Sequence, residues 1–149
     1  MLMNDTNQAE FDFFQSCVIP FRLLDDKVEF LMITSIKKKK WIFPKGYLEF
    51  NLTAFESAKK EAYEEAGVIG ENDTAELGSF ISVKKNGKSF VKVFSMEVSE
   101  ELKDFPEKNL RKKKWMPLSE VLEKNDNKEI HKLVAKLADQ FSKNHQNPT

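Results

Sequence analysis

The chain has 149 residues, which suits one compact domain and is too short for two of ordinary size. Its 24 lysines and arginines balance its 24 aspartates and glutamates, so no net charge draws the protein to nucleic acid or to an anionic membrane. Cys17 is the single cysteine, which excludes an internal disulfide and a cysteine-based metal site.

The two ends of the chain are polar. Residues 1–14 carry acids where a signal peptide needs a basic patch followed by an apolar segment. No apolar run approaches the roughly 18 to 20 residues that span a bilayer. We therefore expect a cytoplasmic protein without membrane contact, folded as a single domain over residues 1–149, with flexible ends at residues 1–14 and 143–149.

Two apolar segments near the N-terminus predict a β-hairpin. β-Branched and aromatic side chains fill residues 16–23 (SCVIPFRL) and 28–35 (VEFLMITS), and the intervening LDDK favours a turn. Pro20 predicts an edge position or a bulge in the first strand, because proline donates no ladder hydrogen bond. Residues 41–44 (WIFP) predict a short further strand that ends at a proline.

A helix is predicted over residues 53–66. Thr53 and Glu56 have the spacing of a capping box, and Gly67 is typical of a helix C-terminus. Small apolar side chains recur at three- and four-residue steps, which favours packing close against a sheet. They are Ala54, Phe55, Ala58, Ala62 and Ala66.

The second half of the chain contains a stronger hairpin signal. Asn86-Gly87 separates the apolar segments 78–84 and 88–98 and favours a tight primed turn. A last strand at 112–117 and helices at 118–124 and 128–141 follow. Strands before and after the first helix, with helices again at the end, predict an α/β fold in which helices cover both faces of a mixed sheet.

Three glutamates gather near the end of the predicted helix. Glu61, Glu64 and Glu65 are three and four residues apart, so their side chains project on one side. They repel one another, and the helix macrodipole disfavours an anion there by roughly 0.3 to 1 kcal/mol. One interpretation is a solvated acidic face offset by Lys59 and Lys60. The other is a site for Mg²⁺ or Mn²⁺, which bind carboxylate oxygens.

Residues 46–68 resemble the signature of the Nudix hydrolases, G-x5-E-x7-R-E-U-x-E-E-x-G-U, in which U is a bulky aliphatic residue. The match has no gap, and the matching residues are Gly46, Glu61, Glu64, Glu65, Gly67 and Val68. Flanking segments such as KKWIFPKG and RKKKWMPLSEV resemble the diphosphoinositol-polyphosphate phosphohydrolase-like branch. With them the likeness covers most of residues 15–140.

Three positions depart from the signature. Leu52 stands where the first glutamate belongs and removes a carboxylate that family members can use at the metal site. Lys60 stands at the arginine position, where it keeps the charge but loses the planar, two-pronged donor. Ala62 replaces a larger aliphatic residue.

The resemblance implies an α/β/α sandwich with a mixed β-sheet and a catalytic loop-helix over residues 46–68. It implies Mg²⁺ or Mn²⁺ bound by the Gly46 carbonyl and by Glu61, Glu64 and Glu65, with Lys60 as a further catalytic residue. The general base stays open on the sequence alone; the candidates are Glu61, Glu100, Glu101 and Glu107.

The resemblance also implies the reaction. We expect metal-dependent hydrolysis of a diphosphate linkage in a nucleoside diphosphate derivative, a dinucleoside polyphosphate or a diphosphoinositol polyphosphate. The alternative is a catalytically weak or inactive Nudix-fold module that binds a phosphorylated ligand. The partner is then a phosphorylated small molecule, with no nucleic acid and no membrane, and the protein is a monomer or a homodimer.

The substrate-binding residues expected from position and charge are cations. Lys45 lies beside Gly46, where its ammonium group can hold a phosphate as a point charge. Lys40, Arg22 and Arg111 are weaker candidates for the same contact, and for each of them a solvated surface position is the alternative.

Overall fold

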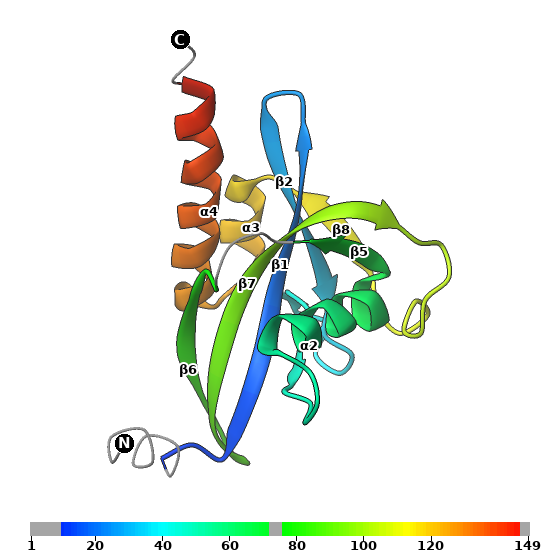
Figure 1. Ribbon diagram of the computed structural model, residues 1–149, viewed down its shortest axis with the longest axis vertical. Helices are drawn as coiled ribbons and strands as arrows, with labels where there is room; N and C mark the ends of the chain where they lie inside the picture. Colours follow the sequence, from blue (N-terminus) through cyan, green and yellow to red (C-terminus); the bar gives the residue numbers. More distant parts are fainter. Residues whose placement is uncertain (1–9, 72–75, 147–149) are drawn as a thin grey trace.

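The structure is a computed structural model that describes residues 10–71 and 76–146 (Figure 1). Within these residues eight strands form one mixed sheet. The strands are β1 (Phe13–Leu24), β2 (Lys27–Thr34), β3 (Trp41–Ile42), β4 (Lys45–Tyr47), β5 (Val68–Glu71), β6 (Gly78–Lys84), β7 (Gly87–Glu101) and β8 (Lys113–Met116). The helices are α2 (Ala54–Glu61), which continues into the π-helical turn η1 (Ala62–Ala66), α3 (Leu118–Lys124) and α4 (Lys128–Gln146).

β1 and β7 form the parallel centre of the sheet. On its other side β1 pairs antiparallel with β4 at residues 15–17 and with β2 at residues 21–24. Pro20 is therefore in an interior strand, which corrects the expected edge or bulge. It lies between the two antiparallel registers, where the neighbour of β1 changes from β4 to β2, so its missing N–H breaks neither ladder.

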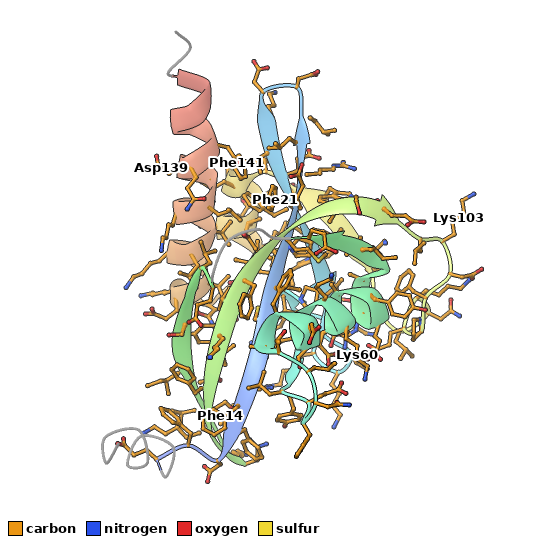
Figure 2. All side chains as sticks on the ribbon, viewed as in Figure 1. Phe14, Phe21, Lys60, Lys103, Asp139 and Phe141 are labelled. Atoms are coloured by element: carbon orange, nitrogen blue, oxygen red, sulfur yellow. The ribbon has the colours of Figure 1, made fainter. Side chains whose placement is uncertain are left out.

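Helices cover both faces of the sheet, as predicted, with α2 and α4 on opposite sides of the β1–β7 pair (Figure 1). Side chains alternate along β1: Ile19 and Phe21 face α3 and α4, whereas Val18 faces α2. The rings of Phe21 and Phe141, on β1 and α4, have centroids 4.9 Å apart (Figure 2). This two-faced burial makes the fold an α/β/α sandwich.

α2 begins and packs as the sequence predicts. Glu56 N–H donates to the Thr53 side chain at 3.0 Å, and Thr53 N–H donates to the Glu56 carboxylate at 2.8 Å, which completes the capping box. The three alanines that continue the stripe are fully buried against the sheet; they are Ala58, Ala62 and Ala66.

The last turn of this helix differs from the prediction of a uniform α-helix over residues 53–66. It widens into η1, where Gly67 N–H donates to the carbonyls of Ala62 and Tyr63. Gly67 has a φ of 69°, in the left-handed region that glycine adopts readily. The segment that carries two of the three clustered glutamates is thus a π-turn, a helix form found often at functional sites.

The hairpin turn and the ends of the chain also differ in detail. β6 and β7 are joined by Lys85 and Asn86, one residue earlier than expected, and Gly87 has the positive φ, so the connection is not the predicted primed turn. β1 already includes Phe13, and α4 extends to Gln146, so these parts of the expected flexible ends are ordered elements. Residues 1–9 and 147–149 lie outside the described residues.

Candidate active site

Gly46 and Glu61 meet where β4 lies beside α2. β4 is held by β1, with Gly46 opposite Ser16 in the ladder. A Cβ atom at Gly46 would lie 2.2 Å from a carboxylate oxygen of Glu61. The signature glycine is therefore needed because the Glu61 carboxylate occupies the space that a side chain would fill.

Glu65 lies beside Glu61 and is only 6% exposed. Its Oε1 accepts the N–H of Lys45 at 3.2 Å, and its carboxyl group hydrogen-bonds to that of Glu61. Burial raises the pKa of Glu65 to about 8; the bond to Glu61 acts in the same direction, and Arg111 opposes it. Burial also raises the pKa of Glu61, while the hydrogen bond from Glu65 opposes the increase. Ionisation of one carboxyl group therefore disfavours ionisation of the other.

Glu64 belongs to the same turn but takes different contacts. Its carboxylate lies 3.9 Å from the ammonium group of Lys60, and its carbonyl accepts the N–H of Glu107 at 3.0 Å. Among the described residues no three His, Cys, Asp or Glu side chains are close enough together to hold a metal ion. The predicted set of three carboxylates is thus only partly assembled: Glu61 and Glu65 are together, and Glu64 is turned toward Lys60.

The oxygen donors beside Gly46 nevertheless fit a hard divalent cation. Two carboxyl groups and the Gly46 backbone adjoin one another, which is the donor chemistry that Mg²⁺ and Mn²⁺ prefer. A bound cation would favour the ionised form of both neighbouring carboxyl groups. Glu61, Glu65 and Gly46 are the residues that would hold such an ion.

Lys60 projects from α2 toward the loop that precedes it (Figure 2). Its ammonium group contacts the carboxylate of Glu49, and Lys60 is 43% exposed. Leu52, at the position of the missing glutamate, is half-buried, and its N–H donates to the Glu49 carbonyl at 3.2 Å. Glu49 was not among the site residues expected from the sequence, although its carboxylate lies only three residues before Leu52.

Of the three loop glutamates left open as general base, only Glu107 adjoins the carboxyl pair. Its charge contributes to the raised pKa of Glu61. Glu101 is instead held by Lys113 and by the indole N–H of Trp115. Glu100 stands opposite Ile69 in the β5–β7 ladder and is exposed. The structure thus leaves Glu61 and Glu107 as the candidates.

The two arginines expected at the substrate have structural partners instead. Arg22 pairs with Glu29 at 2.7 Å and covers the ring of Trp115. Arg111 is 11% exposed and pairs with Glu107 at 2.8 Å. Neither lines the cavity described below, which corrects the expectation of a phosphate contact for both.

Lys45 and Lys40 do line a cavity of about 830 Å³ beside β4. Four further lysines line it as well: Lys37, Lys38, Lys84 and Lys85. Asp126 is the only carboxylate in this lining, and it pairs with Lys40 at 3.2 Å. Burial lowers the pKa of Lys45, and the nearby charge of Lys84 adds to that effect. The cavity thus holds an excess of positive charge that suits an anion.

Gly46 and the three glutamates lie within a part of the chain that matches a protein-family model. Residues 14–137 match the NUDIX domain. The chain belongs to the Nudix family. Its fold and its signature segment are therefore those of Nudix hydrolases, and the departures at Leu52 and Lys60 are features of this Nudix protein within that fold.

Relatives among characterised proteins support the assignment. The chain is 38% identical over 112 residues to Nudix hydrolase 18, mitochondrial, of Arabidopsis thaliana, a match that covers 69% of this chain and 63% of that protein. Against Nudix hydrolase 12, mitochondrial, of the same plant the identity is 36% over 106 residues, covering 66% and 52%. The matched region therefore spans between about half and two thirds of these relatives.

Solved structures share the fold at lower identity. The Ap4A hydrolase of C. elegans superposes with a TM-score of 0.70 and 21% identity, covering 85% of this chain and 96% of that one. The NUDIX domain of Shewanella oneidensis NrtR, solved with ADP ribose, gives 0.68 and 15%, covering 89% and 96%. At these identities the likeness concerns the sandwich and not the ligand.

Proposed function

We propose that this Nudix protein is a divalent-metal-dependent pyrophosphohydrolase that cleaves a diphosphate linkage in a small phosphorylated substrate. The observation that carries the proposal is the pair of half-buried Glu61 and buried Glu65 beside Gly46, joined to a lysine-lined cavity through Lys45. The backbone N–H of Lys45 contacts Glu65, while Lys45 itself lines the cavity. Lys45 therefore links the carboxylates to the cavity, whose lining includes neither Glu61 nor Glu65.

The roles of the residues follow from this arrangement. Glu61 and Glu65 hold carboxylate oxygens in place, with Glu64 and the Gly46 carbonyl as further donors. Bound Mg²⁺ or Mn²⁺ would neutralise phosphate oxygens and lower the pKa of a water molecule. Lys45 and Lys40 hold the phosphates by charge, and Glu61 or Glu107 accepts the proton of the attacking water.

The cavity supports a substrate with several phosphates. Six lysines meet there against one aspartate, an excess of charge greater than a single diphosphate needs. Its aromatic members, Phe43 and Phe80, are buried and offer no free ring face for a nucleobase. Of the expected substrates, we therefore place diphosphoinositol polyphosphates, which carry no nucleobase, ahead of dinucleoside polyphosphates, nucleotide sugars and ADP-ribose.

The test is a release assay over these four classes and nucleoside triphosphates, with Mg²⁺ and with Mn²⁺. Hydrolysis that requires the metal and falls at least ~100-fold in Glu65→Gln and Glu64→Gln supports the proposal, because each removes a charged oxygen donor. Glu129→Gln, at an exposed carboxylate on α4 that pairs only with the neighbouring Lys132, is the matched control. Full activity in Glu65→Gln would refute the proposal.

The alternative is a Nudix module that binds a phosphorylated ligand without turnover. Leu52 and Lys60, which both depart from the signature, are the residues that favour this alternative. Binding of a panel member at micromolar concentration, with no product released under either metal, would support this alternative against the first proposal.

Location and assembly stay predictions. No helix in residues 10–71 and 76–146 is long and apolar enough to cross a membrane. A cytoplasmic location was expected from the sequence, whereas two of the relatives carry the word mitochondrial in their names. Imaging of the tagged full-length protein distinguishes the two compartments, and light scattering distinguishes a monomer from a homodimer.

A further inference from the structure

Lys60, the cation at the arginine position of the signature, forms its ion pairs outside the Glu61–Glu65 pair. Lys60 is directed to Glu49, 2.6 Å away, and toward Glu64. The chain has two arginines, and one of them, Arg22, is committed to Glu29. The other, Arg111, comes from the segment before β8, outside the signature, and lies beside Glu65.

The guanidinium of Arg111 is held on three sides. Its Nε donates to the Glu107 carboxylate at 2.8 Å, and its Nη1 donates to the Thr34 carbonyl at 3.1 Å. Its Nη2 lies 3.9 Å from the Oε1 of Glu65. Both side chains are almost fully buried, at 11% and 7% exposed, so their attraction is weakly screened. The planar group thereby sets the direction of two carboxylates at once.

The backbone around Arg111 is fixed as well. The neighbouring Lys112 N–H donates to the Thr34 hydroxyl at 2.9 Å, and the Thr34 N–H donates to the Lys112 carbonyl at 2.9 Å. At the other end of the segment, Glu107 N–H donates to the Glu64 carbonyl of η1 at 3.0 Å. Arg111 is therefore anchored to β2 and to the carboxylate turn independently of Lys60.

We propose that Arg111 is a positioning residue that orients Glu65 and Glu107, the role for which Lys60 lacks both the fork and the direction. The proposal rests on the proposed function of the Glu61–Glu65 site and assigns Arg111 to the carboxylates and not to the substrate. It makes the segment from Glu107 to Arg111 part of the catalytic apparatus.

Arg111→Lys tests the proposal, because it keeps the charge and removes the fork. We expect kcat to fall by about 10- to 100-fold, the usual effect of losing a partner that orients a metal ligand, with KM changed less than about 2-fold. The affinity of the substrate-free protein for Mn²⁺, measured by electron paramagnetic resonance, should fall by about 10-fold. Arg22→Lys makes the same charge-conserving change in the Arg22–Glu29 pair and is the matched control, expected to change neither quantity.

Placing a guanidinium group at position 60 provides the second test. Lys60→Arg alone should change kcat much less than Arg111→Lys does, because Arg111 already orients the carboxylates. In the Arg111→Lys background the same change should recover part of the lost kcat and Mn²⁺ affinity. The kcat of the Lys60→Arg single variant does not depend on the stability of Arg111→Lys, because the single variant keeps the contacts of Arg111.

Three outcomes would overturn the proposal. The first is a rise in KM with kcat unchanged in Arg111→Lys, which indicates a substrate contact. The second is unchanged kcat and Mn²⁺ affinity in that variant. The third is a gain of about 10-fold or more in kcat from Lys60→Arg alone. The Mn²⁺ titration stays informative when no panel substrate is hydrolysed. That result would refute the proposed function and leave the orienting role of Arg111 to be decided by metal affinity.

Discussion

The ammonium group of Lys60 lies 2.6 Å from a carboxylate oxygen of Glu49, three residues before Leu52. Glu49 is also tied to α2 through its N–H, which donates to the hydroxyl of the buried Ser57 at 3.2 Å. A carboxylate from the loop thus reaches the exposed side of the catalytic helix although position 52 has none. Glu49 thus holds Lys60, whose ammonium group also lies 3.9 Å from the Glu64 carboxylate.

Glu49→Gln should lower kcat/KM by about 2- to 5-fold, because a half-exposed ion pair of this kind is worth ~0.2 to 1 kcal/mol. The matched control is Glu71→Gln, which removes the partner of the adjacent Lys59 from a pair 2.7 Å apart and distant from the carboxyl pair. Equal losses of kcat/KM in the two variants would show that the Glu49 pair has no special part in the site.

Leu52→Glu restores the carboxylate of the signature. We expect it to change wild-type turnover less than about 2-fold, since Glu49 already occupies Lys60, and to recover the activity lost in Glu49→Gln. Steady-state kinetics of the two single variants and the double variant form the cycle. A large gain in the wild-type background would mean that the missing glutamate limits the rate.

Gly46→Ala should lower kcat/KM by about 100-fold or more, because displacing a site carboxylate by about 1 Å has effects of that size. The new Cβ would lie 2.2 Å from the Glu61 Oε2 and would push that carboxylate out of place. Gly78→Ala is the control: its Cβ would meet a terminal methyl of Leu133 at 2.6 Å, which a side-chain shift relieves. Activity retained in Gly46→Ala would contradict the described contact.

Lys45→Met should raise the melting temperature of the ligand-free protein and weaken substrate use. Burial and the charge of Lys84 disfavour the ammonium form of Lys45, so a neutral side chain of similar length removes an unfavourable charge. The lost phosphate contact should lower kcat/KM by about 10- to 100-fold, the range for a hydrogen bond to a charged group. Lys103→Met, at an exposed lysine far from α4 in Figure 2, should change neither.

The stability of the protein in the presence of a chelator should depend on pH through Glu65. Burial raises its pKa from the ordinary 4.5 to about 8, so the folded state binds a proton that the unfolded state releases. The stabilising contribution is complete below about pH 4.5 and is lost as the pH rises through 8, by an amount on the order of a few kcal/mol. Glu65→Gln should flatten this decline in urea unfolding curves between about pH 4.5 and 8. Parallel curves for the two proteins would contradict the raised pKa.

The sequence by itself determined the features that depend on near neighbours. The capping box at Thr53, the alanine stripe and the grouping of Glu61 with Glu65 follow from helical spacing, because residues three and four apart share a face whatever surrounds them. The two hairpins and the covering of the sheet on both faces were predictable for the same local reason, through turn residues and alternation along the strands.

Only the tertiary structure decided which distant side chains complete the site. Arg111 reaches Glu65 because β8 pairs with β2 and places the preceding segment over η1, a register that one sequence does not reveal. The lysines at positions 84 and 85 join Lys45 because the β6–β7 turn closes on β4 across the cavity. Contacts between residues dozens of positions apart depend on how layers pack, and a local pattern carries no information about that packing.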